Sequence, residues 1–170
     1  DISAQKQSAL QAQRDAGAHA ELVRVQQRMS ALDLPVEEVL LLAARTAMDL
    51  ADGQGAMVVL REGDRLRVRA STGPRAAPLD ESRPMLGYPL WQQLEAEQMV
   101  LHSDGSQQHA QFATDEGQHG LLSFIAAPLR AGDTVLGMLK VNADPVFTFS
   151  QRQVAYVQIL AESLGAVLQL

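Results

Sequence analysis

The chain of 170 residues contains no cysteine. This absence excludes disulfides, thiolate ligands for a metal, and a cysteine acting as nucleophile or redox switch. The sequence also lacks any apolar run of the roughly 18 residues that a membrane span needs, and it shows no signal peptide. We therefore expect this fragment to make no membrane contact and to be cytoplasmic.

Positive charge is scarce as well. Lysine and arginine total 14 against 20 aspartates and glutamates, a net charge of -6. Such a balance provides no general attraction to nucleic acid or to an anionic membrane, so we expect no nucleic-acid partner. Hydrophobic residues make up 46% and charged residues 20%, the profile of a folded rather than a disordered chain. The length suits one domain, or one domain with a linker helix.

Residues 1–32 are rich in Gln, Ala, Arg and Glu and predict a helix. Ala18, Leu22, Val25, Met29 and Leu32 alternate spacings of four and three, which is an a/d seam. Either this helix packs against its own domain or it forms a parallel coiled coil with a second copy, and we favour the second copy. We place a linker helix at 1–32 and a separate domain at 33–170. Because the chain has no initiator Met and ends within an apolar helical pattern, we expect it to be part of a longer protein.

Residues 33–70 predict a helix and then a hairpin. A capping residue, a proline and two glutamates begin the helix at 33–38, and its apolar face continues to Leu50. Residues 56–60 and 65–70 read as strands joined by a Gly-containing turn. In the second strand arginines alternate with Leu66, Val68 and Ala70, which we expect to share one apolar face, and residues 72–84 that follow read as loop. The row of arginines could bind phosphate or an acidic partner, but we favour solvated side chains or ion pairs within the chain. The arginines are Arg65, Arg67 and Arg69.

The central stretch, residues 121–142, predicts two buried strands joined by a tight turn at 131–134. Residues 124–129 and 135–141 are almost continuously apolar, as expected of strands covered on both faces. Pro128 removes a backbone donor from the first strand, so we expect a bulge or an irregular edge there. Gly137 has no side chain and would let another backbone or a helix approach closely.

The last helix begins at Ser150 and Gln153, a capping-box pattern. It carries two apolar stripes, and only one of them can cover the sheet. The other must be deeply buried or shared with a partner, and we favour a homodimer in which the first and last helices of two chains form a bundle. The expected interface residues are Leu22, Val25, Met29, Val157, Ala161, Leu164 and Leu168.

Four segments together resemble the C-terminal half of a GAF domain, a small-molecule sensory fold of bacterial signalling proteins and cyclic-nucleotide phosphodiesterases. They are residues 123–129 (SFIAAPL), the pair Gly132-Asp133, residues 136–141 (LGMLKV) and residues 147–150 (FTFS). The resemblance extends over about residues 35–168. It implies an α/β (α+β) fold: a GAF- or PAS-like central antiparallel sheet of about five or six strands, with helices on both faces and dimerisation helices at the ends.

The resemblance also implies where a ligand would bind, between the sheet and the excursion at residues 88–120, part of which commonly covers the cavity in this family. Apolar residues there would form the wall, and a few polar ones would fix the orientation of the ligand. The expected wall residues are Trp91, Leu101, Phe112 and Phe124. The expected polar residues are His102, His109 and Asp115.

The sequence motifs do not indicate a metal, a cyclic nucleotide or a bilin as cofactor. The His and acidic residues between 102 and 119 match no HExxH, EF-hand or zinc spacing, so we favour a solvated loop over a metal site. Residues 112–116 (FATDE) match only part of the signature of cyclic-nucleotide-binding GAF domains, which makes that ligand an unfavoured one. A thioether-linked bilin is excluded because there is no cysteine. The cofactor therefore stays open.

No catalytic constellation is visible: there is no nucleophile elbow and no meaningful carboxylate pair. We expect a non-catalytic regulatory sensor domain of a multidomain bacterial signalling protein, such as a diguanylate cyclase, a phosphodiesterase of cyclic di-GMP signalling or a histidine kinase. It would bind a small ligand and relay the signal through dimer helices. The alternative is a ligand-free module for dimerisation and signal relay, with its pocket filled by its own side chains.

Overall fold

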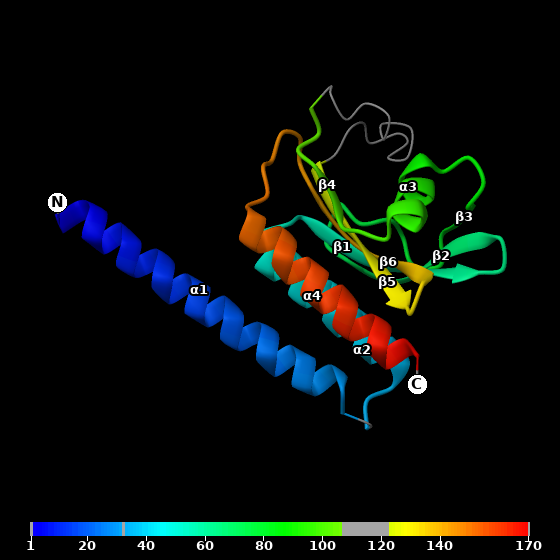
Figure 1. Cartoon of the computed structure of the whole chain (residues 1–170), viewed down its shortest axis with the longest axis horizontal. Helices are drawn as coiled ribbons and strands as arrows, with labels where there is room; N and C mark the ends of the chain where they lie inside the picture. The colour runs from blue at the N-terminus through cyan, green and yellow to red at the C-terminus, as the bar shows by residue number, and fades with distance from the viewer. Residues whose placement is uncertain (1, 32, 107–122, 170) are drawn as a thin grey trace.

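The structure is a computed structural model that describes residues 2–31, 33–106 and 123–169 (Figure 1). Within these residues one sheet is flanked by helices. The helices are α1 (Ile2–Met29), α2 (Val36–Leu50), α3 (Pro89–Glu97) and α4 (Gln151–Leu168). The strands are β1 (Gly55–Glu62), β2 (Arg65–Thr72), β3 (Ser82–Pro84), β4 (Leu101–Ser103), β5 (Ser123–Ala131) and β6 (Thr134–Ala143).

The six-stranded sheet has the order β3-β2-β1-β6-β5-β4, and every described pairing is antiparallel. The predicted hairpin is present as β5 and β6, and its turn includes Gly132 with φ of 61°. The irregularity expected near Pro128 is a register shift between Leu129 and Arg130. The expected α+β fold with a central antiparallel sheet is thereby confirmed.

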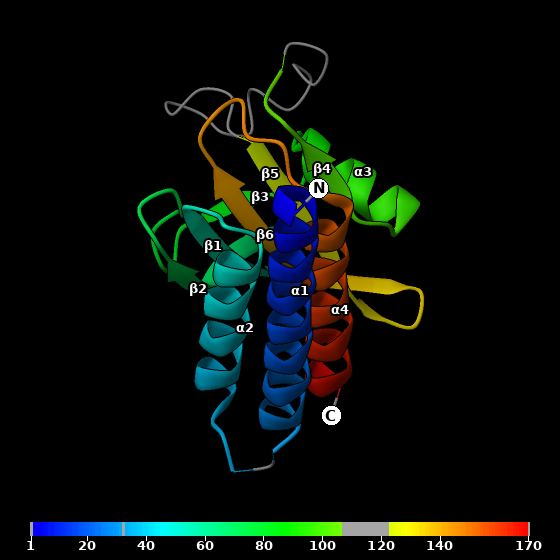
Figure 2. The same cartoon turned by 90° about the vertical axis from the view of Figure 1, so that its left-hand side faces the viewer.

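Helices cover both faces of the sheet, as expected (Figures 1 and 2). Helices α2 and α4 lie on one face with α1 packed against their outer side, and α3 lies on the other face, which we call the α3 face. The helix-side core lies between the sheet and α2 and α4 and contains Leu40, Val58, Ile125, Val141 and Leu160. The α3-side core contains Met57, Val59, Leu66, Val68, Tyr88, Leu90, Trp91, Leu94, Phe124, Ala126, Val135 and Met138.

Helix α1 packs on its own domain through its second half. Leu22, Val25 and Met29 are 2%, 0% and 1% exposed and belong to the helix-side core. Two polar contacts join α1 to α4: Gln26 Nε2 donates to Ser163 Oγ at 2.9 Å, and Asp15 Oδ2 lies 3.1 Å from an Arg152 nitrogen. The first half of α1 is exposed and projects beyond the domain (Figure 1).

This packing changes the argument for a dimer. The residues of α4 that we expected a second copy to cover are buried in the helix-side core of the same chain: Val157, Ala161 and Leu164 are 0%, 1% and 0% exposed. Leu168 is partly buried against the same core. A helix with two apolar stripes needs two covered sides, and the sheet together with α1 and α2 provides them. The homodimer remains a prediction, but these residues no longer require it.

Two smaller expectations are corrected. The segment at 72–84, expected to be loop, contains strand β3, which pairs with Arg65–Arg67 of β2 and shields that edge of the sheet. Ala70, expected to share a face with Leu66 and Val68, lies in the helix-side core instead. A register shift between Val58 and Val59 introduces an extra residue in β2, and one residue is enough to reverse the face of the side chains beyond it.

Gly137 provides the first test of this packing. It pairs with Leu60 and with Leu129, and a Cβ at this position would meet the carbonyl oxygen of Val59. We expect Gly137→Ala to lower the free energy of unfolding by about 1–3 kcal/mol, as overpacking does. The control Gly17→Ala adds the same methyl where nothing lies within 4 Å, and should leave stability unchanged or raise it by less than about 1 kcal/mol. Urea denaturation of both variants checks the pair; equal effects would contradict the close approach at Gly137.

The position of α1 has its own test. Because the native chain has no cysteine, Gln26→Cys with Ser163→Cys places the only two thiols where the native side chains already touch. After mild oxidation we expect a disulfide within one chain, seen as a monomer on a non-reducing denaturing gel. A covalent dimer would instead mean that α1 lies on the α4 of a second copy.

Candidate functional site

Two polar residues of β6, Lys140 and Asn142, lie on the α3 face. Directly paired residues of neighbouring antiparallel strands share a face. Lys140 pairs with Met57 and with Ala126, both in the α3-side core. Asn142 pairs in the same way with Gly55 and with Phe124. A cation and an amide therefore stand side by side on an otherwise apolar surface.

Both polar residues are buried, each with 2% of its surface exposed. The ammonium of Lys140 lies 5.3 Å from the centroid of the Phe124 ring, a cation–π distance. Lysine is rarely fully buried, so Lys140 is an unusual residue for the inside of this sheet. We did not select Lys140 or Asn142 from the sequence. The available signal was a charged residue inside the apolar run at 135–141.

Two buried polar atoms on this side have no hydrogen-bond partner among the described residues: Asn142 Oδ1 and Trp91 Nε1. The orientation of the Asn142 amide is determined, because its Nδ2 donates to the carbonyl oxygen of Arg75 at 2.9 Å. Its Oδ1 is therefore the acceptor left over. A buried group without a partner costs about 1–3 kcal/mol, so both atoms favour the presence of a bound molecule with complementary groups.

The structure brings together some of the predicted ligand residues. Trp91 and Phe124, each 1% exposed, are members of the α3-side core, and Leu101 packs against it. His102 is not with them. It pairs with Ile125, a residue of the helix-side core, and is exposed, so it faces away from Trp91 and Phe124.

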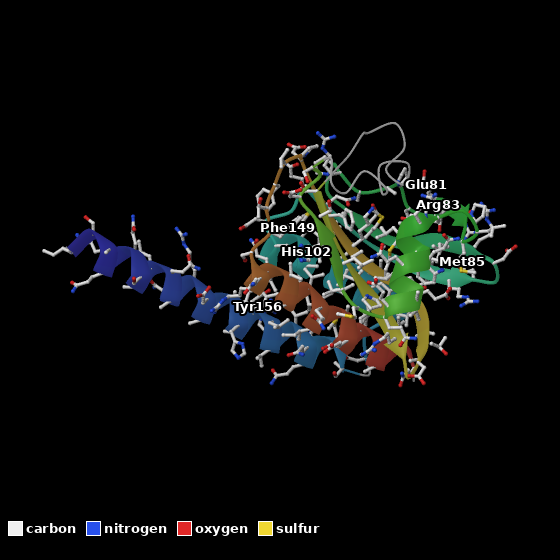
Figure 3. All side chains as sticks on the ribbon, turned by 45° about the horizontal axis from the view of Figure 1, so that its top comes forward. Glu81, Arg83, Met85, His102, Phe149 and Tyr156 are labelled. Atoms are coloured by element: carbon white, nitrogen blue, oxygen red, sulfur yellow. The ribbon has the colours of Figure 1, made fainter. Side chains whose placement is uncertain are left out.

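Figure 3 shows His102 in the region of Phe149 and Tyr156, away from Arg83 and Met85 near α3. The alternation of side chains along β4 explains the difference, since Leu101 and His102 are adjacent and must point to opposite faces. The remaining predicted ligand residues, His109, Phe112 and Asp115, lie outside the described residues. Within the described ranges, no group of three or more His, Cys, Asp or Glu residues is placed to hold a metal ion.

The arginine row of β2 forms ion pairs within the chain, as favoured from the sequence. Arg67 Nε lies 2.8 Å from Glu62, and Arg69 lies 3.3 Å from Glu62 and 3.4 Å from Glu37. The hydrogen bond from Arg67 lowers the pKa of Glu62, and Glu62 in turn raises the pKa of Arg67. Arg65 Nε donates to Ser82 Oγ of β3 at 3.2 Å. These guanidinium groups support the sheet edge and the beginning of α2.

A hollow of about 280 Å³ lies at the junction of β6 with α4 and is lined by Asp52, Gln54 and residues 143–147. Its acidic side chains already have partners: Asp144 Oδ1 lies 2.7 Å from Arg75 Nη2, and Asp52 Oδ2 accepts from Gln153 Nε2 at 3.0 Å. The Asp144 backbone N–H also donates to Gln54 Oε1 at 2.9 Å. We therefore interpret this hollow as part of a structural junction rather than as the ligand site.

Ser123, the first residue of β5, connects this junction to the end of β4 by hydrogen bonds. Its buried hydroxyl lies 2.8 Å from the carbonyl oxygen of Asp104 and 3.0 Å from that of Asp144, with one proton shared between them. It accepts from the Phe147 backbone N–H at 2.8 Å. Since Arg75 contacts both Asn142 and Asp144, the junction connects the α3 face to the first turn of α4.

The chain matches a family model described as the GAF domain over residues 33–169. No curated protein matches it. Among the helices that the structure describes, none combines the length and the apolar character required to cross a membrane.

Solved structures share its fold. The GAF domain of a phosphoenolpyruvate-protein phosphotransferase from Coxiella burnetii aligns with a TM-score of 0.76 at 13% identity, over 91% of this chain and 94% of that one. The corresponding Acinetobacter domain aligns with a TM-score of 0.73 at 19% identity, over 87% and 90%. A phycocyanobilin-bound GAF domain from a cyanobacterial phytochrome gives 0.70 at 18% identity, over 89% and 93%. At these identities the likeness concerns the fold alone.

The ion pairs of Glu62 predict a pH effect. A carboxyl whose pKa is lowered in the folded state contributes stability above its unfolded pKa, and this contribution is lost as the pH falls through the folded pKa. We expect Glu62→Gln to lower the urea midpoint at neutral pH and to match the unsubstituted protein at acid pH, where Glu62 is protonated. The control Glu38→Gln, at an exposed position near the start of α2, should change the midpoint less. A Glu62→Gln deficit that persists undiminished in acid would contradict the assigned ion pairs.

Proposed function

This chain belongs to the GAF domain family, whose members are sensory and regulatory domains of signalling proteins, and from that premise we propose that it binds a small molecule on the α3 face and relays its presence to α4. The observation that carries this proposal is the set of buried polar groups on that face. Lys140 is a buried cation, and Asn142 Oδ1 and Trp91 Nε1 lack partners among the described residues. A bound molecule would supply the missing hydrogen bonds of Asn142 Oδ1 and Trp91 Nε1.

The surroundings suit an organic ligand. The Phe124 and Trp91 rings and the Leu101 side chain supply apolar surface, and Asn142 and Lys140 supply polar contacts two residues apart on one strand. A few polar groups within an apolar lining are the usual composition of small-molecule sites. The ligand is held noncovalently in this proposal, since the chain offers no cysteine for a thioether.

The hydrogen bonds of the junction supply a path for the signal. Asn142 Nδ2 binds the Arg75 carbonyl, the Arg75 side chain pairs with Asp144, and Asp144 lies between β6 and α4. At the beginning of α4, Ser150 and Gln153 form a capping box, and Gln153 also binds Asp52. A ligand that binds one arrangement of this junction more tightly would shift its population and so the setting of α4.

We propose no catalytic role for this chain. In the proposal, the catalytic output belongs to another domain of a bacterial cytoplasmic protein, such as a diguanylate cyclase, a phosphodiesterase or a histidine kinase, and two copies of this chain associate through their terminal helices. With Leu22, Val25 and Met29 already buried, a homodimer would use the exposed outer surfaces of α1 and α4 or exchange α1 between chains.

A second function, the ligand-free relay module, is favoured by the density of the α3-side core. Its Leu90, Leu94 and Met138 side chains are 0%, 0% and 1% exposed. In such a module the chain's own side chains would occupy the whole face, and the junction would couple α4 to a neighbouring domain only mechanically.

Trp91 provides the test between these functions, because it is the only tryptophan and its fluorescence reports on the site. Adding the small-molecule fraction of a bacterial cell extract should change the emission of Trp91 and raise the melting temperature, since ligands that bind only the folded state stabilise it. Native mass spectrometry should show the added mass. Unchanged emission, melting temperature and mass would favour the relay module.

The relay has a separate test in Arg75→Ala. With the same small-molecule fraction, hydrogen exchange of the backbone at 143–153 should change in the unsubstituted protein. In Arg75→Ala this change should be lost while the Trp91 emission still responds. The control Arg45→Ala, at an exposed position of α2, should behave as the unsubstituted protein. If Arg75→Ala retains the full exchange response, the path through Arg75 and Asp144 is wrong.

A further inference from the structure

Resting on the proposed function, we infer that the molecule sensed on the α3 face is a neutral organic compound that carries both a hydrogen-bond donor and an acceptor, such as an amide or a lactam. Its N–H or O–H group donates to Asn142 Oδ1, and its carbonyl oxygen accepts from Trp91 Nε1. The family match specifies no ligand, so this chemistry follows from the two residues themselves.

Both polar atoms border strand β5 on the α3 face. Asn142 of β6 pairs directly with Phe124 of β5, so their side chains are neighbours on this face. Trp91 belongs to α3, which packs on β5, and to the same core as Phe124. Trp91 and Asn142 are 1% and 2% exposed, and neither polar atom has a hydrogen-bond partner among the described residues. A molecule bound between α3 and the β5–β6 pair would therefore meet both atoms.

Asn142 supplies an acceptor of determined orientation. Its Nδ2 donates to the Arg75 carbonyl oxygen at 2.9 Å, so the amide group cannot turn its N–H hydrogens toward a ligand without losing that bond. The backbone at Arg75 and Ala76 lies directly against Gly55, the residue paired with Asn142 on β1. Oδ1 therefore requires a hydroxyl or an N–H group of the ligand. The oxygens of an ionised carboxylate have no hydrogen to donate.

Trp91 supplies the opposite group. The indole Nε1 always carries its hydrogen and has no capacity to accept, so its partner must be an oxygen or nitrogen acceptor of the ligand. An ammonium group cannot take that place. A buried N–H without a partner loses the hydrogen bond that it made to water in the unfolded chain. Trp91 and Asn142 therefore require different groups on one molecule, and a simple anion or cation provides only one of them.

The two contacts favour a ligand without charge. Asn142 Oδ1 and Trp91 Nε1 are the ends of neutral dipoles, and a charged group that loses its hydration is poorly compensated by such dipoles. Neither bond involves Lys140, whose ammonium lies 5.3 Å from the centroid of the Phe124 ring. An amide or a lactam carries a donor and an acceptor without charge, and its planar shape suits the neighbouring rings of Trp91 and Phe124.

The first experiment identifies what the protein retains. Each protein is incubated with the small-molecule fraction of a bacterial cell extract and washed by ultrafiltration, and the retained compounds are identified by mass spectrometry. We expect a neutral compound with both groups, and Asn142→Leu should retain at least tenfold less of it. The control Gln92→Leu removes an exposed amide from the next residue of α3 and should retain the compound fully.

The same samples report on the indole contact. Because Trp91 is the only tryptophan, its indole N–H gives one assigned signal in a nitrogen-15 correlation spectrum. We expect this signal to move downfield when the compound is bound, since the N–H then donates a hydrogen bond. A signal that does not move while a compound is retained would show that Trp91 Nε1 is not a ligand contact.

The second experiment tests each contact with defined probes by isothermal titration calorimetry. Oxindole carries an N–H and a carbonyl, 2-indanone replaces the N–H by a methylene group, and indole keeps the N–H but has no carbonyl. Oxindole should bind more tightly than either analogue by roughly tenfold, the effect of one buried hydrogen bond. Asn142→Leu should abolish only the preference over 2-indanone, and Trp91→Phe only the preference over indole. The control Leu94→Met, which changes the packing of α3 but neither polar group, should keep both preferences.

The contrary outcomes separate this inference from the proposed function. If the retained compound is an ion or a hydrocarbon, or if oxindole binds no better than its analogues, the assigned ligand chemistry is wrong while the sensor function stands. If none of the three probes binds, the retained compound and its methylated derivative take their place, and the same dependence on Asn142 and Trp91 is required. If no compound is retained and the indole signal responds to nothing, the sensor function fails as well. Should Asn142→Leu not fold, Asn142→Ala replaces it.

Discussion

Strand β6 is paired on both edges, with β1 and β5, and covered on both faces by helices. Its side chains from Met138 to Ala143 are therefore buried whichever face they occupy. Because Gly137 has no Cβ, the backbone of β1 at Val59 can approach β6 closely. Each face of the strand also needs its own covering helices. A polar group in such a strand is costly unless it is hydrogen-bonded, and Asn142 Oδ1 has no hydrogen-bond partner among the described residues.

The two faces of the sheet differ in composition. The helix layer is thick and apolar: α2 and α4 lie on the sheet, and α1 lies against them with Leu22, Val25 and Met29 buried. Close packing gives this side few alternatives, so it is suited to transmit a displacement as a unit. The α3 face combines rings and aliphatic side chains with a cation and an amide, and so has the composition expected for recognition. In the proposed function Asn142 would contribute to both recognition and transmission, since its Nδ2 donates to the Arg75 carbonyl oxygen and its Oδ1 is left for a ligand.

The junction between β6 and α4 makes coupling between the faces physically reasonable. Ser123, Asp144, Gln54 and Gln153 join the ends of several elements by hydrogen bonds rather than by apolar packing. Hydrogen bonds are directional, so a change of a few tenths of an ångström at one of them can exchange one partner for another, whereas apolar contacts would only slide. Ser123 is an example, because its one hydroxyl proton can be donated to the carbonyl oxygen of Asp104 or to that of Asp144.

The sequence by itself determined most of the elements, although it did not reveal strand β3. The apolar runs at 124–129 and 135–141 indicated a doubly covered hairpin, the capping box at Ser150 and Gln153 located the beginning of α4, and the family resemblance indicated the fold. These are local signals, encoded in spacing and in residue type. Trp91, Leu101 and Phe124 could be selected because large apolar side chains near the expected pocket are usually buried.

Only the tertiary structure decided which side each residue faces and what covers it. His102 lies on the helix side of the sheet because the register of β4 pairs it with Ile125. A shift of one residue in that register would place every side chain of β4 on the opposite face. The apolar seam of α1 packs against α2 and α4 of the same chain. A heptad pattern shows that a helix needs a partner, but it does not show which helix lies within reach. In the sequence, Lys140 is a single charged residue within an apolar run. Its pairing with Met57 and Ala126 shows that it lies on the α3 face.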